Sequence, residues 1–434
     1  MLTNQEECVN DGLLLWNKAI QCIPGGNSLL SKRPERYLPD LWPTYYSKAK
    51  GCLVWDMEGN KYVDMAQMSM GAVVLGYCNE EVDQAAKDAI NSCVSTTLNS
   101  PKEVLLAEKL IELNPFAGGV KFARTGGEAM GIAVRIARAF TGKDVIAFSG
   151  YHGWCDWYLA ANLSGNNNLN DHLLPGLSPL GVPSGLKETA LPFKYNDVDE
   201  LRELIKDNPD IGIIIIEGAR YDYPTQEFID TIHGLAKDNN LVIISDEISS
   251  GWRISDGGVY KTNGLCPDIV VYGKGLGNGY AISAVVGKKS VMDVAQDTFI
   301  SSSSWTESLG FTVALKTIEI YTRDKVWEHL IRIGTLIGDG WLKLANKHHL
   351  RIKITDFKPL ITMRLDYGDK NSALITLFTQ EMLKRGYLAA SSVYVSYSHT
   401  EEIVKVYLKH VDSVFCLLKA VSYTHLTLPT TPYV

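Results

Sequence analysis

The sequence has no two cysteines at the close spacing of a zinc knuckle or a redox-active CxxC motif, although its 434 residues include eight cysteines. Such scattered single cysteines favour reduced thiols in the cytosol. The first residues, MLTNQEECVNDG, lack the apolar core of a signal peptide, and the longest apolar runs are only strand-sized. We therefore expect a cytoplasmic protein with no membrane contact.

Positive charge is also scarce. The 42 lysines and arginines are outnumbered by 49 aspartates and glutamates, which gives a net charge of −7. No strong positive field is available to attract nucleic acid or an anionic membrane. With 46% hydrophobic residues the chain is an ordinary globular protein that can bury a sizeable core. Small molecules are therefore the expected partners, and nucleic acid is not.

Strand and helix patterns alternate through the middle of the chain. Apolar helical faces are expected in 102–115 (with Val104 and Leu110 on the face) and in 128–142 (with Ile132 and Phe140), and a further helix in 227–239. Strands are expected at VKFA (120–123), DVIAF (144–148), IGIIIIE (211–217), LVIISD (241–246) and PDIVVYG (267–273). Continuous apolar strands of this kind belong to parallel sheets buried on both faces. The pattern predicts an α/β fold whose ligands gather at the carboxyl ends of the strands.

The chain divides into four predicted regions. Residues 1–54 form an N-terminal segment of a small domain, 55–320 a large domain, and 321–420 a C-terminal small domain of mixed helices and strands. A hairpin is expected in VWDMEGNKYVDM (54–65), turning at Glu58 to Asn60. The Thr- and Pro-rich end, 421–434, loses the amphipathic pattern before it and is predicted to be a non-native or flexible tail.

The stretch YGKGLGNGY (272–280) surrounds Lys274 with glycines directly after an apolar strand. A dinucleotide loop would need a helix next, but AISAVVG (281–287) is β-branched and predicts another strand. A Walker phosphate loop would need Gly-Lys-Ser/Thr, which does not occur. Lys274 is therefore either a solvated loop lysine or a reactive amine with room for a bulky group beside it.

A lysine that forms a Schiff base with pyridoxal phosphate needs an acid for the pyridine nitrogen, an anion site and a stacking face. Asp246 comes at the end of an apolar strand, where a buried acid needs a cationic or hydrogen-bonding partner. The alternative is that Asp246 caps a helix. Thr125, Gly126 and Gly127 begin a helix whose N–H groups favour a phosphate, although any helix can start this way. Tyr151 could stack on a planar ring or be an ordinary core or surface tyrosine. All these features are predicted to share one rim of the sheet.

From about 23 to 420 the chain resembles the class III pyridoxal-phosphate aminotransferases, and most closely the group similar to glutamate-1-semialdehyde aminomutase. The segments TGGEA, GYHGW, SDEISSGWR, GKGLGNGY and SSSSWTES occur in the family's order. The resemblance implies a fold type I enzyme with a large, mostly parallel α/β domain. It also implies a smaller α+β domain built from both chain ends, and a homodimer with active sites at its interface.

By this resemblance, Lys274 carries the cofactor, Asp246 binds the pyridinium, and Gly126 and Gly127 hold the phosphate. Ile248 is expected on the ring face opposite Tyr151. The resemblance further assigns Glu217 to the cofactor's 3′ oxygen side, although EGARYDYP departs from the family's Glu-Pro. It also implies that the Ser303 hydroxyl, in place of a threonine, reaches the phosphate of the neighbouring subunit.

The substrate end departs from the aminomutase. Where that enzyme uses an arginine to hold the substrate carboxylate, this chain has Ser31, which cannot supply a bidentate guanidinium. The resemblance places the pocket near Ser69, and Met68, Met70 and Trp154 would make it rather apolar.

We expect an aminotransferase that moves an amino group between a small amine or amino acid and a keto acid or aldehyde through the lysine Schiff base. The alternative is an intramolecular 2,1-aminomutase with the same site. A regulatory or scaffold module that binds without turnover is less consistent with a retained lysine, aspartate and phosphate loop. No metal is expected.

Overall fold

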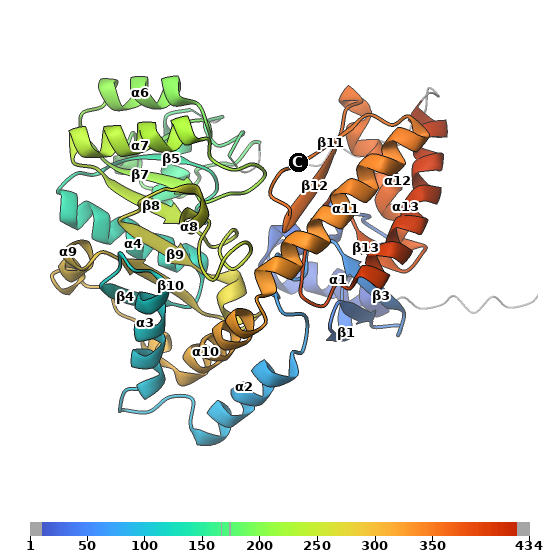
Figure 1. The fold of residues 1–434 in the computed structure, drawn as a ribbon, viewed down its shortest axis with the longest axis horizontal. Helices are drawn as coiled ribbons and strands as arrows, with labels where there is room; N and C mark the ends of the chain where they lie inside the picture. The colour runs from blue at the N-terminus through green and yellow to red at the C-terminus, as the bar shows by residue number, and fades with distance from the viewer. Residues whose placement is uncertain (1–10, 166, 173–174, 423–434) are drawn as a thin grey trace, which may run out of the picture. The chain divides into compact units, whose positions relative to one another are not determined.

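The structure, a computed structural model, describes residues 11–165, 167–172 and 175–422. The described chain forms two compact units (Figure 1). The larger unit contains residues 71–75 and 80–331, and the smaller unit contains the described residues within 1–70, 76–79 and 332–434. The predicted domain boundaries at 54, 320 and 420 stay predictions.

The larger unit is built on a seven-stranded sheet in the order β4-β10-β9-β8-β7-β5-β6. Its strands are β4 (Gly119–Ala123), β5 (Val145–Ser149), β6 (Ala190–Pro192), β7 (Ile211–Glu217), β8 (Val242–Asp246), β9 (Ile269–Tyr272) and β10 (Ser283–Gly287). Neighbours from β9 to β6 are parallel, whereas β10 runs antiparallel to both β9 and β4. The expected mostly parallel α/β sheet is confirmed. The segment after the lysine loop is a strand, as its β-branched residues predict.

Helices accompany this sheet: α2 (Glu80–Ser92), α3 (Pro101–Leu113), α4 (Gly126–Thr141), α5 (Asp156–Leu159), α6 (Val198–Asp207), α7 (Gln226–Asn239), α8 (Tyr260–Asn263), α9 (Lys289–Met292) and α10 (Ser308–Arg323). Helix α4 packs across β4, β7, β8, β9 and β10, and its buried face includes Ile132 and Ile136. It ends at Gly142, whose φ of 67° is left-handed and suits glycine. These contacts hold α4 in place on the sheet, with its first residues just beyond the carboxyl end of β4.

The apolar faces predicted for two helices are only partly correct. In α3 the buried residues are Leu106 and Leu110, whereas Val104 is 59% exposed. In α4, Phe140 is 46% exposed. Helical periodicity identified the helices but not the full extent of the buried stripe.

The smaller unit contains two small sheets and four helices among its described residues. One sheet has the order β1-β2-β3-β13, with β1 (Tyr46–Lys50), β2 (Leu53–Asp56), β3 (Lys61–Met65) and β13 (Tyr387–Ala389). The other joins β11 (Ile352–Ile354), β12 (Leu360–Leu365) and β14 (Ser392–Tyr394). The helices are α1 (Asp11–Cys22), α11 (Val326–His348, whose first turn belongs to the larger unit), α12 (Asn371–Leu383) and α13 (Glu401–Ser422).

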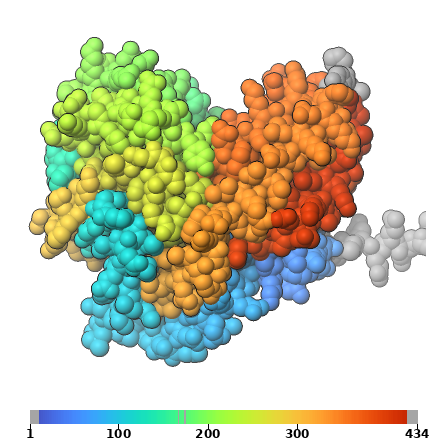
Figure 2. Space-filling view, viewed as in Figure 1, coloured from blue at the N-terminus to red at the C-terminus, as the bar shows by residue number. Residues whose placement is uncertain are grey.

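The predicted hairpin is present, because β2 and β3 pair antiparallel across the turn that contains Gly59. Helices α11 and α13 form much of the visible surface of this unit, coloured orange to red (Figure 2). Of the predicted tail, 421 and 422 still belong to α13, and 423–434 lie outside the described residues. Within the described ranges, no helix combines the length and apolarity needed to cross a bilayer.

Candidate active site

Lys274 lies just beyond the carboxyl end of β9, at the start of a 3-10 turn, Lys274–Gly277. Its backbone has a φ of 40°, a left-handed conformation that is strained for a lysine. The ammonium donates to Ser249 Oγ at 2.5 Å. Burial, followed by the nearby charge of Arg253, lowers the pKa of Lys274 to about 8. About a tenth of this amine is therefore unprotonated at pH 7, far more than for an ordinary lysine, and a nucleophile or base requires this form.

Asp246 is the last residue of β8 and is 4% exposed. Its Oδ2 lies 2.8 Å from Nδ1 of buried His152, and its Oδ1 accepts a hydrogen bond from the Ile248 N–H at 3.0 Å. The other ring nitrogen of His152 lies 3.1 Å from the Ser149 carbonyl oxygen, which fixes the imidazole. A carboxylate has about four acceptor positions, so Asp246 is held in place and can still accept from a cationic ring nitrogen.

The start of α4 is held by a capping box. Thr125 Oγ1 accepts from the Glu128 N–H at 3.3 Å, and Glu128 Oε2 accepts from the Thr125 N–H at 2.8 Å. The N–H groups of Gly126 and Gly127 come next and have no partner within the helix. A Cβ on Gly126 would lie 2.9 Å from Ile248 Cδ1, so a larger residue would require the Ile248 side chain to shift. These N–H groups are the donors that an anion at the start of α4 would use.

Tyr151 and Ile248 lie at the same rim. Tyr151 is half-buried, and its N–H donates to Glu217 Oε2 at 3.3 Å. Burial, and then the Asp246 charge, raises the pKa of the Tyr151 phenol. Ile248 also packs against Gly273, since a Cβ there would lie 3.3 Å from Ile248 Cγ2. These contacts link the helix start, the Asp246 strand end and the lysine loop into one site.

The remaining predicted site residues belong partly to each of the two units. Trp154 is 69% exposed and lies over Gly127, whose Cβ would be 2.9 Å from Trp154 Nε1. Ser303 is exposed in the turn Ser303–Thr306 of the larger unit. Ser31 and Ser69 belong to the smaller unit, where Ser69 has a φ of 54° and the Ser31 carbonyl accepts from Tyr37 at 3.1 Å.

Sequence reasoning missed several residues at the site. His152 and Ser249 lie within the quoted motifs GYHGW and SDEISSGWR but were given no role. Arg253, 1% exposed, donates from Nε to the Ser249 carbonyl at 3.3 Å, and its other end contacts the Gly71 carbonyl. His152 and Ser249 each follow soon after a strand end, at Ser149 and Asp246, and this position was the available signal.

The residues present fit pyridoxal phosphate. A half-buried amine, a fixed buried carboxylate and a bare helix start lie at one rim of the sheet, and side chains in place of Gly126 and Gly127 would narrow it. Lys274 would hold the aldehyde carbon, Asp246 the ring nitrogen, and the start of α4 the phosphate. No group of three or more metal-binding side chains occurs in the part of the chain that the structure describes.

Comparison with known proteins identifies the class. Residues 39–357 match the family described as Aminotransferase class-III. The chain belongs to the class III aminotransferases, and it is a pyridoxal-phosphate-dependent enzyme that acts on amine and carbonyl substrates.

Among its relatives is the 3-aminobutyryl-CoA aminotransferase of Cloacimonas acidaminovorans, 33% identical over 89% of this chain and 92% of the relative. The glutamate-1-semialdehyde 2,1-aminomutase of Methanocaldococcus jannaschii is 28% identical over 92% of this chain and 97% of its own. A solved omega-transaminase from Sphaerobacter thermophilus has a TM-score of 0.84 at 20% identity and covers 95% of this chain and 99% of that chain. The structural likeness confirms fold type I.

Proposed function

We propose that the enzyme transfers an amino group between two substrates, an amine or amino acid and a keto acid or aldehyde. The observation that carries this proposal is the Lys274 amine, held by Ser249 at 2.5 Å, with a pKa lowered to about 8. Such an amine can both bind a carbonyl carbon and, once released, accept a proton near neutral pH.

When bound, pyridoxal phosphate supplies an aldehyde for the amine and a protonated ring that accepts the electron pair left at the substrate Cα. Lys274 Nζ takes the proton from that Cα. Asp246 would accept from the ring nitrogen, and its 2.8 Å contact with His152 Nδ1 keeps the carboxylate from rotating away. Ser249 positions Nζ through its hydroxyl.

We propose roles for the other predicted site residues from the family resemblance and from their contacts in the structure. Gly126 and Gly127, with the Thr125 hydroxyl, bind the phosphate, and Tyr151 and Ile248 contact the two faces of the ring. Glu217, which accepts from the Tyr151 N–H, lies on the 3′ oxygen side. Trp154, Ser31 and Ser69 are candidate substrate contacts.

The working enzyme is proposed to be a cytoplasmic homodimer in which Ser303 reaches the neighbouring site. The exposed Ser303, together with the 86% exposed Phe299 nearby in sequence, supports a surface covered by a second subunit. The seven described cysteines are free, which supports a reducing compartment. Sedimentation velocity of the full chain tests the dimer.

An intramolecular aminomutase remains the competing function, because one relative carries that name at 28% identity. Ser31, where the resemblance implies an arginine in the aminomutases, argues against glutamate semialdehyde as substrate. The aminotransferase relative instead suggests donors with the amino group on the third carbon of an acyl chain.

Two experiments test the proposal. Lys274→Ala should abolish the visible imine band of the holoenzyme, and an unchanged spectrum would refute the lysine assignment. Enzyme in its pyridoxamine form should then be mixed with a panel of keto acids and aldehydes. Turnover that requires two different substrates supports transfer between molecules, whereas turnover of a single substrate alone supports the mutase.

A further inference from the structure

Arg253 is a buried cation close to the reacting lysine. It lies in the turns that follow β8, and only 1% of the residue is exposed. Arginine is seldom buried to this degree, because the transfer of a charge out of water is costly. A charge kept here at such a cost points to a role in the site beside it.

Two backbone carbonyls of the larger unit hold the Arg253 side chain. Its Nε donates to the Ser249 carbonyl at 3.3 Å, and its Nη2 donates to the Gly71 carbonyl. Both acceptors are neutral, so these two contacts fix the guanidinium without cancelling its charge. The preceding residue, Trp252, is 2% exposed and has a strained φ of 61°, so packing holds the turn in one conformation.

Ser249 contacts both cations. Its carbonyl accepts from Arg253, and its hydroxyl accepts from Lys274 Nζ at 2.5 Å. The guanidinium and the amine are therefore separated by a single residue. A like charge at this range disfavours the charged form of a titratable group, and a lysine can lose its proton whereas an arginine cannot.

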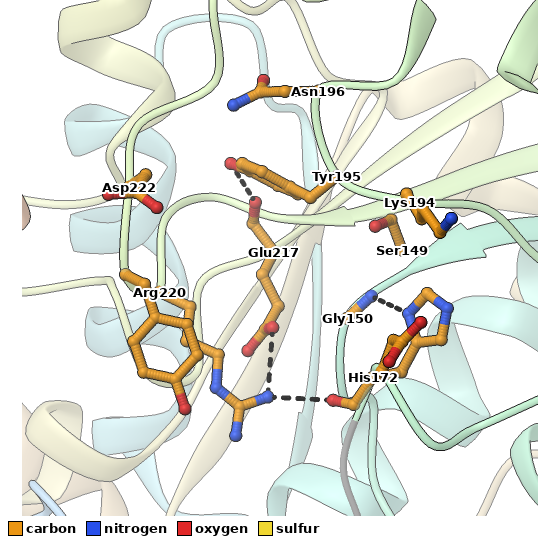
Figure 3. A pocket seen from close by; sticks show the side chains of 11 residues that line it. Ser149, Gly150, His172, Lys194, Tyr195, Asn196, Glu217, Arg220 and Asp222 are labelled. Atoms are coloured by element: carbon orange, nitrogen blue, oxygen red, sulfur yellow. Dashed lines mark hydrogen bonds and ion pairs between the residues drawn. The ribbon is translucent and has the colours of Figure 1, made fainter. Parts of the chain in front are cut away.

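Burial is the largest cause of the lowered pKa of Lys274, and the charge of Arg253 is the next. Glu217 and Arg220 follow with opposite effects, since the charge of Glu217 raises this pKa and that of Arg220 lowers it. These two residues form an ion pair, with 3.5 Å between Oε2 and Nη1 (Figure 3). Asp246 raises the pKa by less. Arg253 is therefore the charge that acts most strongly on the amine.

We propose that Arg253 is a positioning residue for amino transfer, which opposes protonation of the Lys274 amine and holds that amine in place through Ser249. The role requires the charge of Arg253 at this position and no free donor of its guanidinium. A lysine must be unprotonated both when it attacks an aldehyde and when it takes a proton from a substrate. This inference rests on the proposed role of Lys274.

The first test measures the protonation of Lys274 in the cofactor-free full chain. Acetic anhydride acylates only unprotonated amines, and peptide mass spectrometry reports the labelling of Lys274 at a series of pH values. In Arg253→Met a like charge is lost, so the midpoint should rise by about 0.5–1 pH unit and labelling at pH 7 should fall about 3- to 10-fold. Arg253→Lys keeps the charge, and its midpoint should stay within about 0.3 pH units of the wild type.

Arg138→Met on α4 is the matched control. Arg138 is half-buried and also donates from Nε to a backbone carbonyl, that of Asp144 at 2.8 Å, but its charge is not one of the four described above. Its midpoint should match the wild type. An unchanged midpoint in Arg253→Met, or an equal rise in Arg138→Met, would overturn the inference. Should Arg253→Met fail to fold, Arg253→Gln decides by the same midpoint: a rise supports the inference and no change overturns it.

Ser249→Ala separates the two actions of Arg253. The hydroxyl accepts from the ammonium and favours the charged form, so its loss should lower the midpoint, opposite in sign to Arg253→Met. Because Nζ is then no longer held, kcat should fall about 3- to 10-fold, and Ser249→Thr, which keeps the hydroxyl, should restore it. An unchanged kcat in Ser249→Ala would overturn the action through Ser249.

The holoenzyme gives a further readout without turnover, because the visible imine band changes when the imine nitrogen loses its proton. The midpoint of this spectral titration should also rise in Arg253→Met and stay in place in Arg253→Lys. If the midpoints move in this way but no amino group is transferred, the proposed function fails and this inference stands. If transfer occurs and neither midpoint responds to Arg253→Met, only this inference fails.

Discussion

Replacement of Lys274 by methionine should change how the stability of the cofactor-free protein depends on pH. Methionine has nearly the same length but no charge. In the folded chain the pKa of Lys274 is about 8 instead of 10.5, because burial disfavours the ammonium. Burial of the ammonium therefore lowers the free energy of unfolding by its full amount below pH 8. This destabilisation disappears as the pH rises from 8 to 10.5.

The magnitude follows from that difference in pKa. At 1.36 kcal/mol per pH unit, full burial would destabilise the wild type by about 3 kcal/mol at pH 7 and about 1 kcal/mol at pH 10. Lys274 is only half-buried, and solvent screening reduces the pH 7 value to about 2 kcal/mol. Loss of the Ser249 contact costs the variant about 1 kcal/mol at every pH and does not alter the slope.

Urea unfolding of both cofactor-free proteins from pH 7 to 10 measures the effect. The free energy of unfolding of Lys274→Met minus that of the wild type should fall by about 1–2 kcal/mol across this range. The exposed Lys237 on α7 provides the control, and Lys237→Met should give a difference within about 0.5 kcal/mol at each pH. A difference for Lys274→Met that is constant or rises with pH would refute the assignment of a depressed pKa.

Two further predictions concern buried polar contacts. Asp246→Asn removes the negative charge beside the ring nitrogen and should raise the dissociation constant of pyridoxal phosphate about 10- to 100-fold, measured by fluorescence quenching; an unchanged constant would contradict the role of Asp246. Tyr407→Phe leaves the buried Trp341 indole N–H, now 3.2 Å from the Tyr407 hydroxyl, without this acceptor. It should cost about 1–2 kcal/mol in thermal unfolding without changing the imine spectrum, and an equally stable variant would contradict the importance of this bond.

Much of the larger unit was predictable because its strands are uninterrupted apolar runs. β7, for example, is IGIIIIE, and all seven of its residues are buried. The lysine loop was separated from a dinucleotide loop by the β-branched segment that follows, which forms β10. Gly142 was predictable as the end of α4 because the left-handed position after a helix suits glycine.

The rest of the site could not be predicted, because it depends on contacts between distant segments. His152 and Asp246 meet only because β5 and β8 end at the same rim, with β7 between them. Arg220 follows β7 in the chain, and only the structure shows that its Nη1 lies 3.5 Å from Glu217 Oε2. The exposure of Val104 and Phe140 also needs tertiary information, since periodicity alone does not show where a helix meets its neighbours.

The reversed direction of β10 has a consequence for spacing. It lies between β4 and β9 and runs against both, so these two strands point the same way although they are not neighbours. Two steps across the sheet, about 10 Å, therefore separate the turn before α4 from the turn that carries Lys274. A molecule that contacts both turns must therefore span about this distance, and one more strand between them would add about 5 Å to it.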